Sequence, residues 1–85
     1  MTTVFFRKEE DGEILAVFAF DYRKGANGGT FGCYAHIGQH SECCLDYIKE
    51  STKQATRDEY APLLSELKQI GYDPIVIKKI PPMYL

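Results

Sequence analysis

The sequence predicts a single small α+β domain, with a largely antiparallel sheet of four or five strands and one main helix packed on a face. The first observation behind this prediction is the length, because 85 residues supply one small domain and no second one. The second is a first half in which β-branched and aromatic runs alternate with Gly-rich breaks. The third is an amphipathic stretch in the second half that starts at a capping box. The expected element order is ββββαβ, and βββααβ is the alternative.

Two strands are expected at residues 3–7 and 14–20. The first run is β-branched and aromatic, and the second is apolar throughout. Between them, Asp11-Gly12 is a dipeptide that tolerates the positive φ of a tight hairpin, so the two strands should be antiparallel neighbours. Both faces of the second run are apolar, which predicts a central strand covered on both sides.

A third strand is expected at residues 30–37, after a Gly-rich and Asn-rich stretch at residues 21–29 that predicts a mobile loop. Alternation in this strand puts Tyr34 and His36 on the face opposite the apolar one. Residues 38–42 then have the composition of a connecting loop. The apolar face consists of Phe31, Cys33, Ala35 and Ile37.

Residues 43–52 fit two patterns. A helix with Ser41 as N-cap would align Cys44, Leu45 and Ile48 in one stripe. A strand would place Cys43, Leu45 and Tyr47 on one face. The helical stripe is slightly cleaner, and both alternatives stay open at this point.

The main helix starts at a capping box, in which the Thr56 hydroxyl and the Glu59 carboxylate each accept from the other residue's amide. Pro62 predicts either a kink or a later start near Ala61. Gly71 is expected to end the helix in the left-handed conformation. The apolar stripe consists of Tyr60, Leu63, Leu64, Leu67 and Ile70.

A last strand is expected at residues 75–80, with Ile75 and Ile77 pointing inward and Pro81-Pro82 ending it. These elements together predict one core. Its expected members are Val4, Phe6, Leu15, Val17, Ala19, Phe31, Cys33, Ala35, Ile37, Leu63, Leu64, Leu67, Ile70, Ile75 and Ile77.

Composition and charge narrow the class of function. Hydrophobic residues make up 45% of the chain and charged residues 26%, as in a globular rather than a disordered protein. A net charge of −2 supplies no positive field for phosphate backbones, so nucleic-acid binding is disfavoured. The chain is too short for a doubly wound nucleotide-binding sheet, and we expect no cofactor.

The sequence also favours a cytoplasmic protein. Its start lacks the pattern of a secretory signal, and no run approaches the roughly 20 apolar residues that span a bilayer. The three cysteines are an odd number and two of them are adjacent. Free thiols in a reducing compartment fit this pattern better than a disulfide framework does.

A polar cluster at the end of the third strand is the predicted recognition surface. Imidazole, amide, hydroxyl and phenol groups supply directional hydrogen bonds and aromatic area, which specific interfaces use. We expect a protein partner or self-association there. The alternative is that His36 and Gln39 only tie down the hairpin turn. The candidate binding residues are Tyr34, His36, Gln39, His40 and Ser41.

The same region suggests two chemical alternatives. Cys and His are zinc ligands, but alternation places Cys33 and His36 on opposite faces, so the metal hypothesis reduces to His36, His40 and Cys43. Ser41 or Cys43 beside a histidine could form a nucleophile and base, yet no orienting carboxylate or oxyanion donor is recognisable. No catalytic residue is therefore assigned.

A third alternative is a weak nucleic-acid site at Tyr22-Arg23-Lys24. An aromatic ring beside cations can stack on a base while the cations meet phosphate. A solvated loop is the simpler interpretation of these three residues.

Two stretches resemble a group of small uncharacterised proteins from bacteria, phages and mobile elements. The first is Tyr-Ala-His-Ile-Gly-Gln-His-Ser at residues 34–41. The second, within residues 52–72, contains Glu-Tyr-Ala-Pro-Leu-Leu-Ser-Glu-Leu and ends in Ile-Gly-Tyr. The resemblance implies no established activity, but it directs attention to residues 38–41. It also favours an extended segment at residues 43–52, which is the prediction adopted here.

Overall fold

The computed structural model describes residues 1–25, 28–36 and 38–84, and within them the predicted α+β fold is confirmed. An antiparallel sheet is joined by two α-helices and a short 3-10 helix. The elements are β1 (Thr2–Glu9), β2 (Ile14–Gly25), β3 (Gly28–Ala35), β4 (Gln39–Cys44), α1 (Leu45–Ser51), β5 (Thr52–Gln54), α2 (Arg57–Gln69), β6 (Pro74–Val76) and η1 (Pro82–Tyr84).

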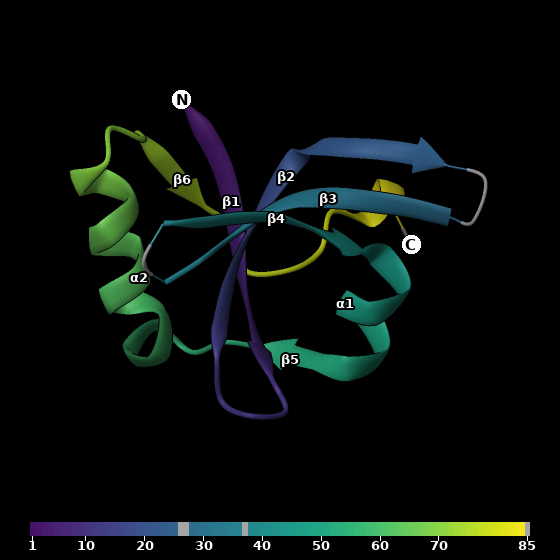
Figure 1. Cartoon of the computed structure of the whole chain (residues 1–85), viewed down its shortest axis with the longest axis horizontal. Coiled ribbons are helices and arrows are strands. Elements are labelled where there is room, and N and C mark those ends of the chain that lie inside the picture. Colours follow the sequence, from purple (N-terminus) through teal and green to yellow (C-terminus); the bar gives the residue numbers. More distant parts are fainter. Residues whose placement is uncertain (26–27, 37, 85) are drawn as a thin grey trace.

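The strands lie in the order β4-β3-β2-β1-β5, so the second strand is central as predicted. Neighbours in this order are antiparallel, whereas β6 pairs with β1 in parallel. In Figure 1 the strands cross at a steep twist, with α2 on one side of the crossing and α1 on the other. The two ends of the sheet order are therefore β4 on one side and β5 on the other.

The sheet buries side chains on both faces, and each face has its own core. Residues of α2 cover one face, while α1 and the C-terminal segment cover the other. The first core consists of Phe5, Leu15, Val17, Ala19, Phe31, Cys33, Ile48 and Ile80. The second core consists of Val4, Phe6, Ala16, Tyr34, Ala55, Leu63 and Leu67. Because successive strand residues alternate between the two cores, Phe5 belongs to the first and Phe6 to the second.

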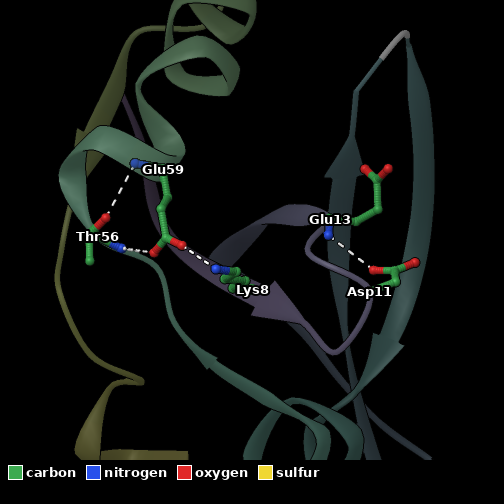
Figure 2. Close-up of polar contacts among 5 residues, drawn as sticks. All are labelled: Lys8, Asp11, Glu13, Thr56 and Glu59. Carbon is green, nitrogen blue, oxygen red and sulfur yellow. Dashed lines mark hydrogen bonds and ion pairs between the residues drawn. The ribbon is translucent and has the colours of Figure 1, made fainter.

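The predicted capping box forms at the start of α2 (Figure 2). Glu59 N donates to Thr56 Oγ1 at 3.3 Å, and Thr56 N donates to Glu59 Oε1 at 2.9 Å. The other oxygen of this carboxylate meets Lys8 Nζ at 2.5 Å, which fastens the helix start to β1. Helix α2 begins at Arg57, so the alternative of a later start, near Ala61, is wrong.

The helix ends as predicted at Gly71, whose φ is 109°. Tyr72 N donates to Leu67 O at 3.0 Å and Gly71 N donates to Lys68 O at 3.2 Å. These two bonds form a Schellman ending, and they return Tyr72 to the sheet beside Phe18, at 5.3 Å between ring centroids.

The loop predicted at residues 21–29 is wrong for the residues that the structure describes. β2 continues to Gly25 and β3 begins at Gly28, so the two form one long hairpin. A register shift between Val17 and Tyr22 bends β2 in the middle. The Tyr22 ring consequently lies against the first core, and Phe20 is left 66% exposed.

The strand predicted at residues 43–52 is wrong for most of its length. Cys43 and Cys44 end β4, but Leu45–Ser51 is helix α1, because one turn of helix buries Ile48 against the first core. Ser41 lies within β4 and is not an N-cap; Cys44 holds that position without a side-chain bond.

Two further core predictions are wrong. Ile70 follows the last turn of α2 and is 50% exposed. Ile75 is 43% exposed, because β6 aligns Val76 rather than Ile75 with the buried Val4. β6 also ends at Val76, earlier than predicted. Ile37 lies outside the described residues. The buried residues of the hydrophobic core that the sequence prediction omitted are Phe5, Ala16, Tyr34, Ile48, Ala55 and Ile80.

Candidate functional site

The predicted binding residues lie on the hairpin that joins β3 to β4. Tyr34 is in β3, His36 is in the turn, and Gln39, His40 and Ser41 begin β4. The predicted loop at residues 38–42 is therefore wrong, since the chain is already a strand from Gln39 onward. A two-strand ladder, and not a loop, positions these side chains.

Tyr34 is a core residue, so the expectation that its phenol faces solvent is wrong. Its side chain is 1% exposed and belongs to the second core under α2. The hydroxyl donates to Glu66 Oε2 and accepts a hydrogen bond from Gly38 N at 2.9 Å. The bond to Glu66 raises the pKa of the Tyr34 phenol. Tyr34 thereby ties the turn to α2.

Glu66 of α2 holds the same turn a second time. Its Oε1 atom lies 2.6 Å from Nδ1 of His36, whose side chain is otherwise exposed. A role of His36 in tying down the hairpin turn was the alternative to recognition, and its partner in this contact is a carboxylate. One helical side chain therefore holds two residues at the start of the turn, and Gly38 on its far side is held through the Tyr34 hydroxyl.

His40 is a second exposed imidazole of the site. Its Nε2 atom lies 2.9 Å from the Tyr72 hydroxyl, and its ring stands edge-on to Tyr34 at 4.9 Å between centroids. Phe18 stacks on it at 6.4 Å. These contacts orient the ring over the face of the sheet that α2 leaves partly uncovered.

The register of β3 and β4 decides which side chains share a face. His40 pairs with Tyr34, which places it on the α2 face, whereas Cys43 pairs with Phe31 on the opposite face. The metal set His36, His40 and Cys43 therefore does not converge. In the described ranges no group of three His, Cys, Asp or Glu residues could hold a metal ion.

The Tyr22-Arg23-Lys24 segment does not form one surface. Tyr22 packs against Tyr84 at 4.6 Å and Phe31 at 5.0 Å between ring centroids. Arg23 lies 3.6 Å from Glu42 across the ladder. A nucleic-acid base could not stack on the Tyr22 ring, because this ring already packs against the first core.

The outer side of β4 is one edge of the sheet. β4 ends the sheet order, and no strand pairs with its outer side in the part of the chain that the structure describes. Five of its six side chains are exposed and Cys43 is half-buried. β4 contains no proline and no lysine, which are common protections of a sheet edge. Its outward N–H and C=O groups can therefore accept another strand.

A shallow cleft of about 640 Å³ lies beside β4 on the α2 face. Gly32 forms part of its floor, and a Cβ there would collide with the Asp21 carboxylate. The sequence analysis missed most of this cleft because the bend in β2, which exposes Phe20, leaves no mark in the alternation pattern. The lining includes Phe18, Phe20, Arg23, His40, Glu42 and Tyr72.

The two cysteines of the opposite face interact. Cys33 is buried, and its hydrogen bond with Cys43 together with burial raises the pKa of its thiol. The same hydrogen bond lowers the pKa of Cys43. All three cysteines are free, and Cys44 is exposed on the other side of β4.

No helix among residues 1–25, 28–36 and 38–84 is long and apolar enough to cross a membrane. Comparison with protein-family models, with curated proteins and with solved structures finds no match to this chain.

Proposed function

We propose that the chain is a non-enzymatic protein-binding module that recognises an extended segment of its partner by adding it to β4. The observation that carries the proposal is the open outer side of β4, a six-residue strand at the end of the sheet order. Strand addition takes its affinity from backbone hydrogen bonds and its specificity from alternate side chains. β4 offers both kinds of contact.

The rigid support of the hairpin favours this function. Tyr34 and His36 both bond to Glu66, and the turn amide of Gly38 bonds to Tyr34. A binding strand held in its bound conformation loses less entropy when it meets a partner. The polar network under the turn thus acts as support, and the exposed residues of β4 act as the contact surface.

Side chains on the two faces of β4 supply specificity. By register, His40 and Glu42 lie on the α2 face, while Gln39 and Ser41 pair with Ala35 and Cys33 on the face of the first core. Phe20 adds an exposed ring beside the charged pair. An aromatic anchor next to directional polar groups is the usual composition of an energetically important contact.

The compartment and the biological setting are part of the proposal. Three free thiols support a reducing cytoplasm. The resemblance of residues 34–41 and 52–72 supports an association with phages or mobile elements. No observation in the described residues favours the metal or nucleic-acid alternatives.

Two adjacent proline variants test strand addition. N–H groups of successive residues in a strand point to opposite sides of the strand. Of the two variants Ser41→Pro and Glu42→Pro, one (the outward variant) therefore removes an N–H that points away from the sheet, and the other (the inward variant) removes an N–H that donates to β3. The inward variant should lower the thermal stability of the fold and the outward variant should leave it nearly unchanged, so thermal unfolding identifies which variant is which.

The probe for this test is a set of peptides selected from a random displayed library on the purified full chain. Affinity is measured by fluorescence polarisation. The outward proline variant should abolish binding while it stays folded, and bound peptide should slow amide exchange in β4. Equal affinity of the selected peptides for the folded outward variant would overturn the proposal.

A further inference from the structure

We infer that the strand accepted by β4 is β4 of a second copy of this chain, paired antiparallel about a two-fold axis at Ser41. This inference rests on the proposed function and names its partner. Identical edges that pair with each other form an isologous interface, the commonest interface of homo-oligomers. The residues of β4, and the faces of the sheet on which they lie, indicate both the partner and the register in which the two strands pair.

Symmetry limits the possible registers. A two-fold axis perpendicular to the sheet keeps each face continuous between the copies, so residues paired across the axis must lie on the same face. The axis therefore passes midway between the two copies of one residue, which faces its own counterpart. Near the middle of β4 the choices are His40, Ser41 and Glu42.

Charge separates these three registers. An axis at Glu42 would put two carboxylates opposite each other, and an axis at His40 would oppose two imidazoles. An axis at Ser41 instead places His40 of each copy opposite Glu42 of the other. Both side chains lie on the α2 face, so the dimer would contain two equivalent His40–Glu42 pairs.

The surroundings of His40 suit this contact. Its Nε2 atom is engaged by Tyr72, so a further hydrogen bond to a carboxylate would be made by Nδ1. Glu42 is exposed and meets Arg23 only at 3.6 Å, which leaves its carboxylate able to accept from a second donor. On the opposite face, Ser41 meets Ser41 of the second copy and Gln39 meets its Cys43.

A cysteine scan along β4 tests the register directly. In a chain carrying Cys43→Ser and Cys44→Ser, which keeps only the buried Cys33, one further cysteine at a time is introduced by Gln39→Cys, His40→Cys, Ser41→Cys or Glu42→Cys. Directly opposed residues of antiparallel strands have Cα separations that a disulfide can bridge. After oxidation with diamide, only the Ser41 variant should give a covalent dimer that dithiothreitol reverses.

The control for this scan is Ser65→Cys, at an exposed position of α2. Efficient dimer formation by the control or equally by all four positions would indicate random collision. A dimer formed only through the His40 or the Glu42 variant would overturn the register. Either result contradicts the inference.

Charge reversal tests the energetic basis. The dimer dissociation constant is measured by sedimentation from about 10 μM to about 1 mM, since a short edge pairing is a weak interface. Glu42→Lys should raise this constant about tenfold or more, because it acts at two symmetric positions. Adding His40→Glu to that variant should restore dimerisation. Glu50→Lys, the same charge change on the exposed side of α1, should have no effect.

His40→Glu also removes the bond to Tyr72, so thermal unfolding is recorded for each variant. If that variant does not fold, the comparison of Glu42→Lys with Glu50→Lys still decides the question. A wild-type chain that stays monomeric throughout this range while it binds selected peptides would overturn the self-pairing and leave the proposed function standing. If both proline variants still bound the selected peptides, the proposed function itself would be wrong.

Discussion

The two edges of the sheet are built differently. Along the outer side of β1, the short strands β5 and β6 divide the edge between them, three residues each, and β6 starts at Pro74. Along the outer side of β4, no described segment pairs with the six-residue strand. One end of the sheet therefore consists of two three-residue strands paired along β1, called the covered edge below, and the other end is a single six-residue strand with no described partner on its outer side.

The charged side chains at the two edges differ in the same way as the backbone pairing does. Three consecutive residues of β1 bond to elements packed against the sheet: Arg7 to Thr52 and Ile48, Lys8 to Glu59, and Glu9 to Tyr47. In β4 the charged side chain of Glu42 meets the exposed Arg23 and no other charged group among the described residues. Charged residues therefore stabilise the fold at the first edge and stay accessible at the second.

The largest expected effect comes from breaking the covered edge. Arg7 donates to Thr52 Oγ1 at 2.9 Å, to Thr52 O at 2.8 Å and to Ile48 O at 3.2 Å. Arg7→Ala leaves these acceptors without that donor and should lower the free energy of unfolding by about 2 to 3 kcal/mol. Urea unfolding measures the loss. Arg23→Ala, which removes an exposed arginine, should change stability by less than about 0.5 kcal/mol. Equal losses in the two variants would contradict this account.

The next effect comes from loosening the support under the open edge. Tyr34→Phe deletes the hydroxyl that bonds to Glu66 and Gly38, at an expected cost of about 1 to 2 kcal/mol. Amide exchange in β4 should accelerate more than exchange in β1. Tyr47→Phe, which removes an exposed phenol bonded to Glu9, is the matched control. Uniform acceleration across the sheet would show that the hydroxyl does not act on the hairpin.

A smaller, pH-dependent effect sharpens the comparison at the covered edge. The hydrogen bond from Lys8, with those from Thr56, lowers the pKa of Glu59 from 4.5 to about 2. A depressed pKa stabilises the folded chain fully above the ordinary value, and this contribution disappears as the pH falls through about 2. The difference in melting temperature between wild type and Glu59→Gln should therefore shrink between about pH 5 and about pH 2. A difference that is constant over this interval would contradict the assigned cause.

The smallest effect concerns the thiols of β4 and changes reactivity rather than stability. Iodoacetamide should modify Cys44 and Cys43 in the folded chain, and Cys33 only after unfolding, because Cys33 is buried. Cys33→Ala removes the hydrogen bond that lowers the pKa of Cys43. The pH profile of Cys43 alkylation should then move to higher pH, while that of Cys44 stays in place. Peptide mass spectrometry separates the two sites, and a parallel shift of both would refute the link.

Local signals identified most of the turns and helix ends. Asp11-Gly12 predicted the first hairpin, where Gly12 has a φ of 92° and Glu13 N bonds to Asp11 Oδ1 (Figure 2). Thr56 and Glu59 predicted the start of α2, and Gly71 its end. Each depends on atoms only a few residues apart, so the sequence contains the whole interaction.

The surroundings of the predicted polar cluster differ from those expected. The sequence placed the polar cluster at the end of β3, and the structure finds Gln39, His40 and Ser41 exposed there. It missed that Tyr34 is buried, because the cover comes from α2, more than twenty residues further along the chain. Glu66 and Tyr72 were missed for the same reason.

By itself, then, the sequence determined the fold class, the alternation of β3 and the boundaries of the main helix, because periodicity and capping act over a few neighbouring residues. Tertiary structure alone decided that β2 bends between Val17 and Tyr22 and which edge of the sheet stays open, whereas the pattern of residues 43–52 had left the helix α1 as one of two alternatives. These features depend on the packing of residues distant in sequence, where burial of a shared surface outweighs local preference.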